Sequence, residues 1–338
     1  MTISNSRSNT RVVFTKRPEG EATADCFSVE SQELAELQPG QVRVAVEYVS
    51  VDAGARTMLR GEGFHHQVGL GETMTGGGVG YVIDSKADGW EEGQAVRGPF
   101  GAQTVSTVTP DLMTKIDESV APISFYLGVL GEATGVTAWI GMRHVAKPGP
   151  GDVFVVSAAA GAVGSIAGQI AKKEGATVIG IAGGARKVEY LTGKLGFDAA
   201  IDYKNEDVKA RLKELAPAGV NIFYDNVGGP ILDAVLDNLA LRTRIVICGA
   251  ISQYNDMDNV TGPSLYLRLA ERQSVMEGFA YFHFPESVEP AKKELANWVA
   301  DGSLILEEEI LEGLERYPDA LQFMFNGGNL GKLLIKTS

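Results

Sequence analysis

The strongest constraint on the fold comes from the stretch between Val153 and Ala171, which contains no ionisable side chain. It begins with a β-rich run, VFVVS, passes through the small residues of AAAGAVG and ends in the helical pattern of SIAGQIA. A membrane-spanning helix needs about 20 continuous apolar residues, but glycine and polar residues make this stretch only weakly hydrophobic. A strand that leads through a glycine-containing turn into a helix is instead typical of a dinucleotide-binding fold.

The turn after this strand resembles a phosphate-binding turn with one departure. Ala159, Gly161 and Gly164 fall at its three glycine positions, so alanine replaces the first glycine. Gly161 lets the backbone approach a pyrophosphate, and Gly164 lets the following helix pack closely on the strand. The first N–H groups of a helix have no acceptor within it, so they favour an anion at this place.

The residues after the next predicted strand indicate which dinucleotide binds. In NAD-binding folds an acidic residue about 20 residues past the first glycine binds the ribose 2′-hydroxyl. Here no acid lies between Ala176 and Lys187, and the strand ends in IAGGARK. A cation gains roughly 1.5 to 3 kcal/mol from a charge-assisted contact with a 2′-phosphate, so Arg186 and Lys187 favour NADPH over NADH. The alternative is that both side chains are merely solvated at the start of a helix.

The rest of the chain is organised as two domains. Short β-rich runs broken by proline and glycine turns fill residues 11–110, among them RVVF, QVRVAVEYVSV, GGGVGYVID and TVSTV. After about residue 121, apolar runs such as ATVIGIA, NIFYDNV and RIVICGA alternate with helical patterns, which favours parallel strands joined by crossover helices. The closing GNLGKLLIKTS returns to β character. We predict an α/β protein in which residues 1–126, completed by 303–338, form one domain and residues 127–302 form a doubly wound parallel sheet.

Composition argues against several classes of partner. The 43 acidic and 30 basic side chains leave a formal charge of -13, which repels nucleic-acid backbones and anionic lipid headgroups. The N-terminal MTISNSRSNT lacks the apolar run of a secretory signal, so we expect a cytoplasmic protein that binds neither nucleic acid nor membrane. Only two cysteines occur, Cys26 and Cys248, too few for a four-thiolate structural zinc site, and we expect no metal.

Several strings resemble those of a known family: LGVLG, VTAW, VVSAAAGAVGSIAGQIAK, LGFDAAIDYK, YDNVGGP, CGAISQYN and the closing GNLGKLLIK. They are similar to the prostaglandin reductase and alkenal double-bond reductase branch of the medium-chain dehydrogenase/reductase superfamily. The resemblance implies a GroES-like, mostly β catalytic domain and a Rossmann domain, with NADPH as cofactor, no metal, and a homodimer formed through the Rossmann domain. The activity it implies is NADPH-dependent reduction of the C=C bond of α,β-unsaturated aldehydes or ketones.

The motifs of that branch carry over to individual positions of this chain. They imply that the backbone of residues 161–164 binds the diphosphate and that Lys187 and Tyr203 meet the 2′-phosphate. Ligands of parallel sheets lie beyond the carboxyl ends of the strands, where Asn226 and Cys248 fall, although Asn226 also suits a plain turn. The residues implied to contact the cofactor are Gly161, Ala162, Val163, Gly164, Lys187, Tyr203, Asn226, Cys248, Gly249, Ala250, Ile251, Ser252, Gln253, Tyr254, Phe279, Ala280, Tyr281 and Asn329.

The expected reaction points to one catalytic side chain. Reduction of an enone leaves negative charge on its carbonyl oxygen, so the site needs a hydrogen-bond donor there and a proton for the α-carbon. Tyr254, just past the fifth strand of the Rossmann pattern, has a phenol with a reference pKa of about 10 that stays protonated near neutral pH. We predict that Tyr254 orients the carbonyl. The rival donor is a ribose hydroxyl of the cofactor, with Tyr254 only packing the loop and solvent supplying the proton.

The chain departs from the branch at two motifs near the expected substrate. DAGAR, which ends at Arg56, stands in place of DPYMR, and LGEATG stands in place of LGMPG with one extra residue and with Glu132. Phe100 falls where relatives place aromatic residues. We expect Arg56, Phe100 and Glu132 to contact substrate, with an exposed turn carboxylate as the alternative for Glu132. Two other functions stay open, namely quinone reduction with NADPH, and NADPH binding without turnover in a sensor or scaffold.

Overall fold

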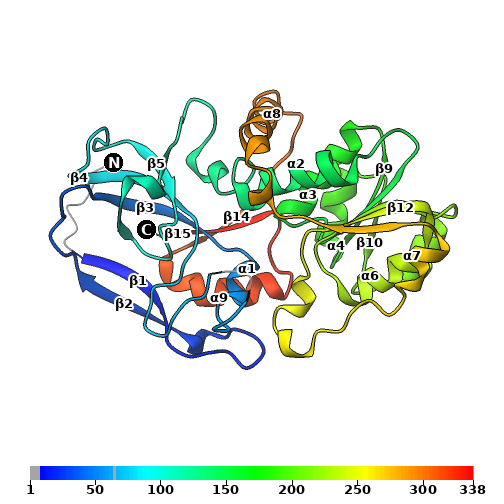
Figure 1. The fold of residues 1–338 in the computed structure, drawn as a ribbon, viewed down its shortest axis with the longest axis horizontal. Coiled ribbons are helices and arrows are strands. Elements are labelled where there is room, and N and C mark those ends of the chain that lie inside the picture. Colours follow the sequence, from blue (N-terminus) through cyan, green and yellow to red (C-terminus); the bar gives the residue numbers. More distant parts are fainter. Residues whose placement is uncertain (1–7, 64–65, 338) are drawn as a thin grey trace. The chain divides into compact units, whose positions relative to one another are not determined.

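The computed structural model describes residues 8–63 and 66–337, which divide into two compact units (Figure 1). The first unit contains the described residues of Met1–Leu127, Glu308–Asn329 and Leu333–Ser338, and the second contains Gly128–Glu307 and Leu330–Lys332. The predicted domain boundaries at 126/127 and 302/303 lie near these divisions and stay a prediction. Residues 1–7 and 338, at the ends of the predicted first domain, lie outside the described residues.

The first unit is a mostly β structure built from both ends of the chain. Its elements are β1 (Ser8–Phe14), β2 (Phe27–Glu33), β3 (Val42–Ser50), α1 (Gly54–Thr57), β4 (Gly78–Ser85), β5 (Ala95–Gly98), β6 (Val105–Val108), β7 (Thr114–Lys115), β14 (Glu308–Glu312), α9 (Tyr317–Phe325) and β15 (Lys332–Lys336). The main sheet has the order β14-β15-β3-β4-β5-β7, with β6 paired to β3, while β1 and β2 form a separate pair. Because β15 pairs antiparallel with β3, the predicted return of the C-terminal segment to the first domain is confirmed.

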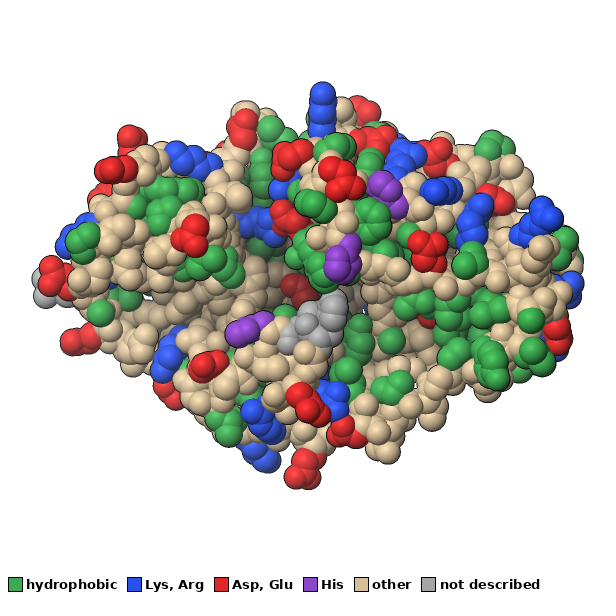
Figure 2. Space-filling view, viewed as in Figure 1, with side chains coloured by type: hydrophobic (Ala, Val, Ile, Leu, Met, Phe, Trp, Pro, Cys, Tyr) green, Lys and Arg blue, Asp and Glu red, His purple; other side chains and the backbone are tan. Residues whose placement is uncertain are grey.

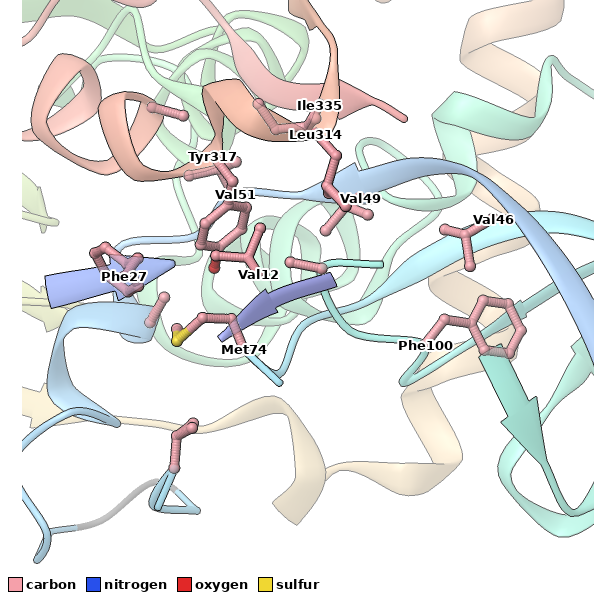
Figure 3. Close-up of a cluster of buried hydrophobic side chains, with 14 of the residues drawn as sticks. Val12, Phe27, Val46, Val49, Val51, Met74, Phe100, Leu314, Tyr317 and Ile335 are labelled. Atoms are coloured by element: carbon pink, nitrogen blue, oxygen red, sulfur yellow. The ribbon is translucent and has the colours of Figure 1, made fainter. Parts of the chain in front are cut away.

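The core of the first unit joins side chains that are far apart in the sequence. Val12 on β1, Val49 on β3 and Ile335 on β15 are fully buried, and Figure 3 shows them in one cluster with Phe27 and Tyr317. The rings of Phe27 and Tyr317 meet edge to face with their centroids 6.4 Å apart. Full burial of a large apolar side chain contributes about 1.5 to 3 kcal/mol, so these contacts hold the C-terminal segment on the N-terminal strands.

The second unit is a doubly wound α/β fold. Its elements are α2 (Thr137–Ile140), β8 (Val153–Ser157), α3 (Ala162–Lys173), β9 (Thr177–Ala182), α4 (Ala185–Glu189), β10 (Ala199–Asp202), α5 (Val208–Leu215), β11 (Val220–Asp225), α6 (Gly229–Leu236), β12 (Leu239–Ile247), α7 (Leu267–Glu271), β13 (Val275–Gly278) and α8 (Val288–Ala300). The strands form one parallel sheet in the order β10-β9-β8-β11-β12-β13. Figure 1 shows α3 on one side of this sheet and α6 on the other. The predicted parallel strands and crossover helices are confirmed.

Burial on both faces explains why the central strands of this sheet are apolar throughout. Val155 on β8, Ile179 on β9 and Phe223 on β11 are buried, and α5 and α6 pack against them in one cluster. The chain reverses its direction of winding between β8 and β11, since β9 and β10 lie beyond one of them and β12 and β13 beyond the other. Ligands of such sheets bind at this switch point, beyond the carboxyl ends of the strands. The loops after β8, β9, β11 and β12 are therefore the expected binding region.

The stretch without ionisable side chains, between Val153 and Ala171, is divided between two elements. It forms the strand β8 and most of the 12-residue helix α3. Within residues 8–63 and 66–337, no helix combines the length and the apolar character that crossing a bilayer requires.

Candidate cofactor site

The turn between β8 and α3, residues 157–164, presents backbone N–H groups to a ligand, and we call it the phosphate turn. Ala158 is left-handed, with φ 47°, and Gly161 N donates to Ala158 O at 2.9 Å. The first hydrogen bond of α3 runs from Ser165 N to Gly161 O at 3.0 Å, so the N–H groups of residues 162–164 have no acceptor within the helix. Free N–H groups at the start of a helix favour an anion such as a diphosphate.

Close backbone approach explains the two glycines of the phosphate turn. A Cβ on Gly164 would lie 2.4 Å from Ala158 O, and a Cβ on Gly161 would lie 3.2 Å from the same atom. The first distance leaves no room for any side chain, and the second is tight. Packing therefore accounts for both glycines, while their contact with a phosphate stays a prediction.

A segment from the far end of the chain lies beside the phosphate turn. Gly331 N donates to Ala160 O at 2.8 Å, and Gly331 forms an isolated parallel bridge with Gly161. Asn329, a predicted cofactor contact, precedes Gly331 by two positions and is itself buried. A contact between Asn329 and the cofactor stays a prediction.

The loops after β9 and β10 gather cationic side chains and one aromatic ring at an edge of the sheet. A Cβ on Gly183 would lie 2.9 Å from Tyr203 Cε1 and 2.8 Å from Lys204 Cε, so both side chains lie against this glycine. Lys187 lies four positions after Gly183 in the chain and is half-buried, whereas Arg186 is exposed. This edge therefore offers a positive surface with a phenol, which suits a phosphate monoester.

Asp202, the last residue of β10, connects these two loops. Its Oδ1 accepts Gly184 N at 2.8 Å and Lys204 N at 3.1 Å, and its Oδ2 accepts Asn205 Nδ2 at 2.8 Å. The bond from Gly184 N is the largest of the effects that lower the pKa of Asp202. The carboxylate of Asp202 therefore binds groups of both the loop after β9 and the loop after β10.

A second strand-end aspartate lies at the switch point. Asp225 ends β11 and is 1% exposed; its Oδ1 accepts Ser157 Oγ at 2.8 Å, Val227 N at 2.9 Å and Gly228 N at 3.0 Å. Burial raises the pKa of Asp225, although these bonds act against it. The neighbouring Asn226 donates its Nδ2 to Ser157 O at 2.8 Å. These contacts fasten the ends of β8 and β11 to each other.

The loop after β12 folds back on itself through Tyr254. The hydroxyl oxygen of Tyr254 accepts Ala250 N at 3.1 Å. Burial raises the pKa of Tyr254, so the phenol keeps its proton at neutral pH and its O–H can donate to a ligand. Cys248 is half-buried, and burial raises the pKa of its thiol to about 11. The thiol is therefore protonated and unreactive as a nucleophile at neutral pH.

The loop after β12 is also fastened to the loop after β11. Ile251 N donates to Asn226 O at 3.2 Å, and Ser252 Oγ donates to Val227 O at 2.6 Å. Gln253 Nε2 donates to Thr261 O at 3.3 Å, within the same long loop. Two segments predicted to line the cofactor therefore lie side by side at the carboxyl edge of the sheet.

The third predicted segment, Phe279–Tyr281, follows β13. The ring of Phe279 meets the ring of Tyr224 with centroids 6.4 Å apart. A Cβ on Gly141 would lie 2.6 Å from both Phe279 Cζ and the Tyr224 hydroxyl, so glycine at 141 is what admits this ring pair. Tyr281 begins the 3₁₀ turn η9 (Tyr281–His283), which contacts the turn η4 (Glu132–Val136) at the start of the α2 region.

The turn η4 accommodates the extra residue of LGEATG. It is π-helical over Glu132–Val136, and a π turn takes one more residue than an α turn and occurs frequently at functional sites. The side chain of Glu132 is 18% exposed and pairs with Lys292 Nζ of α8 at 2.8 Å. The alternative of an exposed turn carboxylate is therefore wrong, because this carboxylate is largely covered and paired. A contact between Glu132 and a substrate stays a prediction.

The two substrate residues predicted in the first unit have clear structural partners. Phe100 is 1% exposed and belongs to the core shown in Figure 3. Arg56 is buried, and its Nε and Nη2 donate to Gly20 O at 3.0 and 2.6 Å. Core packing accounts for Phe100, and the contact with Gly20 holds Arg56 in place. A contact between either residue and a substrate stays a prediction.

Sequence reasoning missed Ser157, Asp225 and Lys204. Each is adjacent to a predicted contact or lies in the same motif: Asp225 precedes Asn226, Lys204 follows Tyr203, and Ser157 opens the phosphate turn. Within the part of the chain that the structure describes, no group of three or more His, Cys, Asp or Glu side chains is placed to hold a metal ion.

Comparison with known proteins finds similarity along both units. Two family models match, one described as the N-terminal domain of oxidoreductase over residues 10–116 and one as zinc-binding dehydrogenase over residues 162–296. A putative NADP-dependent oxidoreductase of Bacillus subtilis, YfmJ, is 40% identical over 336 residues, which are 98% of each chain. An NADP-dependent 2-alkenal reductase of Nicotiana tabacum is 38% identical over 295 residues, 86% of this chain and 85% of the relative.

A solved structure extends the similarity to three dimensions. The crystal structure of CurA from Vibrio vulnificus in complex with NADPH matches with a TM-score of 0.92 at 33% identity, over 97% of this chain and 99% of that chain. The predicted fold class, a Rossmann sheet plus a separate mostly β domain, is confirmed by this match and by the two sheets described above.

Proposed function

Because the chain belongs to the zinc-independent prostaglandin reductase and alkenal reductase branch of the medium-chain dehydrogenase/reductase superfamily, it is an NADP-dependent oxidoreductase, and we propose that it reduces the C=C bond of α,β-unsaturated aldehydes or ketones. The similarity to a 2-alkenal reductase supports this bond as the one reduced. The cofactor choice depends mainly on the edge where Lys204 and Tyr203 lie against Gly183 and where Lys187 follows in α4. NAD-binding folds place an acid at this position.

The residues of the second unit fit NADPH on two grounds. The N–H groups of residues 162–164 have no acceptor within α3, and such groups at the start of a helix suit a diphosphate. Lys187 and Lys204 supply the positive charge that a 2′-phosphate requires, since a phosphate monoester carries about two negative charges at neutral pH. In this proposal Asn226 and the loop of residues 248–254 hold the remainder of the cofactor.

When bound, NADPH supplies a hydride to the β-carbon of the enone, and negative charge develops on the carbonyl oxygen. Tyr254 stabilises that oxygen with its O–H. The same phenol oxygen accepts Ala250 N at 3.1 Å, which fixes the direction of the ring. Burial, by raising the pKa of Tyr254, keeps the donor in its protonated form across the neutral range. The α-carbon takes its proton from solvent or from this phenol.

The test of the reaction is NADPH consumption measured against enals, enones, quinones and simple ketones, with the products identified by mass and by the bond that was saturated. We expect turnover with enals or enones and a product saturated at C=C. Oxidation of NADPH by quinones alone would show that the protein is a quinone reductase and would overturn the proposal. Tight NADPH binding without any turnover would show that the protein binds the cofactor without catalysing a reaction.

The role of Tyr254 has its own test. Tyr254→Phe removes the donor and leaves the ring, so kcat should fall about tenfold or more while the KM for NADPH changes little. The matched control is Tyr81→Phe, because the Tyr81 O–H donates to Glu118 Oε1 in the first unit and has no part in the proposed mechanism. Turnover by Tyr254→Phe at the rate of the unchanged protein would remove Tyr254 from the mechanism.

We also propose that the protein is a homodimer formed through β13. This strand ends the parallel sheet, and among residues 8–63 and 66–337 it pairs on one side only, with β12. Exposed apolar side chains lie on it and nearby, including Val275, Tyr266, and Leu267, which is 63% exposed; Figure 2 shows hydrophobic side chains gathered over α7. An unpaired strand edge beside an apolar surface favours pairing with a second copy of the chain.

Light scattering coupled to size-exclusion chromatography tests the homodimer. We expect the mass of two chains for the unchanged protein and of one chain for Leu267→Glu. Leu112→Glu, at an exposed leucine of the first unit, is the matched control and should leave the dimer intact. A monomer in the unchanged protein, or a dimer that survives Leu267→Glu, would contradict this interface.

A further inference from the structure

A carboxylate is buried at the centre of the proposed cofactor site, and the mechanism described above does not use it. Asp225 is 1% exposed, and the donors it accepts from are all neutral: Ser157 Oγ and the N–H groups of Val227 and Gly228. Among the residues that the structure describes, no Lys or Arg contributes to the ionisation of Asp225. Buried carboxylates usually have a cationic partner, so this charge lacks the usual compensation.

Asp225 lies next to the loop that carries the proposed carbonyl donor, Tyr254. It ends β11 at the switch point, directly before Asn226. Cys248 and Gly249, in the loop after β12, donate their N–H groups to the main-chain oxygen of Asp225 at 2.9 and 3.1 Å. A Cβ on Gly249 would lie 3.2 Å from the Tyr254 hydroxyl oxygen, so Tyr254 also lies against this point of the loop. The negative charge of Asp225 also adds to burial in raising the pKa of Tyr254. The field of this carboxylate therefore reaches the loop that holds the proposed carbonyl donor.

The two forms of the cofactor differ in charge at one place. The nicotinamide ring of NADP⁺ is positive and that of NADPH is neutral, while the diphosphate and 2′-phosphate are the same in both. An uncompensated buried negative charge stabilises a nearby positive ring more than a neutral one, and weak screening inside the protein preserves the effect. Such a charge therefore favours NADP⁺, the form that remains after NADPH has transferred its hydride.

We infer that Asp225 biases the bound cofactor toward NADP⁺ through its buried, uncompensated carboxylate at the switch point, and so promotes hydride release from NADPH. This inference rests on the proposed NADPH site. Asp225 acts without touching substrate in this account. Its hydrogen bonds to Ser157 and to the loop after β11 keep the charge in one place.

The chain offers a matched control in Asp202. It also ends a strand of the same sheet and also accepts backbone N–H groups, from Gly184 and Lys204. It lies beside Tyr203 and Lys204, at the proposed 2′-phosphate contact, which is identical in both cofactor forms. Loss of its charge should therefore change the affinities for NADP⁺ and NADPH by the same factor.

The experiment measures the dissociation constants of NADP⁺ and NADPH by calorimetric titration for the unchanged protein, Asp225→Asn and Asp202→Asn. The ratio Kd(NADP⁺)/Kd(NADPH) should rise about fivefold or more in Asp225→Asn and change by less than about twofold in Asp202→Asn. Equal weakening of both forms in Asp225→Asn would overturn the inference and leave a purely structural role. Failure of the unchanged protein to bind either form would instead overturn the proposed function.

A second measurement needs no variant and covers the case in which Asp225→Asn does not fold. Binding linkage requires that a charge which favours NADP⁺ is itself ionised more readily in the NADP⁺ complex. Carboxyl ¹³C NMR of the unchanged protein should give a lower pKa for Asp225 with NADP⁺ than with NADPH. The same pKa in both complexes would overturn the inference.

Discussion

Two aspartates each end a strand of the same parallel sheet and differ in their surroundings and in the direction of their pKa shift. Asp202, at the end of the edge strand β10, is 8% exposed and lies beside exposed Tyr203 and Lys204. Asp225, at the end of the central strand β11, is surrounded by buried groups and neutral donors. Backbone hydrogen bonds lower the pKa of Asp202, whereas burial raises that of Asp225. The edge of the site is thus made of charged side chains near solvent and its centre of buried backbone contacts.

This difference assigns different tasks to the two regions. In the proposed site, the centre lies where the phosphate turn meets β11, and its backbone geometry is expected to hold the diphosphate that all such cofactors share. The cations of the edge are proposed to meet the 2′-phosphate, which distinguishes NADPH from NADH. Substitutions at the centre should therefore destabilise the protein more than substitutions at the edge. They should also discriminate less between NADPH and NADH binding.

The largest effect is expected at Gly164. Gly164→Ala places a Cβ 2.4 Å from Ala158 O, so the turn or α3 must shift. We expect the free energy of unfolding to fall by about 2 to 4 kcal/mol. We also expect the variant to lose binding of both NADPH and NADH. Gly193→Ala is the control, because nothing lies within 4 Å of its Cβ position. Denaturant unfolding and cofactor titration measure both effects; normal binding by Gly164→Ala would show that the turn is not the diphosphate site.

A smaller and selective effect is expected at Lys187. Lys187→Ala should weaken NADPH binding about tenfold or more, the equivalent of a charge-assisted contact of roughly 1.5 to 3 kcal/mol, and leave weak NADH binding nearly unchanged. Lys213→Ala serves as the control, since Lys213 pairs with Asp237 away from this edge. Fluorescence titration with both cofactors gives the comparison. Equal losses for NADPH and NADH would contradict the division between edge and centre.

The smallest effect is expected in the pH dependence of the free energy of unfolding, to which Asp202 and Asp225 should contribute with opposite sign. The folded-state pKa of Asp202 is lowered, so its stabilisation is present above the unfolded-state value of about 3.9 and is lost as the pH falls through the folded value. The stability advantage of the unchanged protein over Asp202→Asn should therefore shrink on acidification.

Asp225 should show the opposite trend. Its folded-state pKa is raised, so ionisation costs stability above that pKa and the cost disappears as the pH falls through it. The unchanged protein should gain stability relative to Asp225→Asn on acidification. Urea unfolding from about pH 7 down to about pH 3 measures both trends. Trends of the same sign in the two variants would show that the two environments do not differ as described.

Much of the second unit could be predicted from the sequence because its signals are local. The apolar run ending at Ser157, the glycines at 161 and 164 and the helical pattern after them specify β8, the phosphate turn and α3 without long-range information. The absence of an acid before Lys187 is equally local. The same holds for the alternation of strands and helices that specifies a parallel sheet.

The features that could not be predicted depend on contacts between distant residues. Ser157 and Asp225 are 68 positions apart, and only the pairing of β8 with β11 brings them together. Tertiary packing likewise decides that Phe100 lies in a core and that Glu132 pairs with Lys292 of α8. The family resemblance placed Tyr203 in the site but gave no reason to include Lys204. The sequence of a strand end does not reveal which side chains turn toward the preceding loop.

The most direct test of the account is a crystal structure of the protein with NADP⁺. We expect the diphosphate on the N–H groups of residues 162–164 and the 2′-phosphate within hydrogen-bond distance of Lys187, Tyr203 or Lys204, with the nicotinamide ring beyond the carboxyl ends of β11 and β12. A 2′-phosphate that points into solvent away from these side chains, or a diphosphate bound elsewhere than on the phosphate turn, would contradict it.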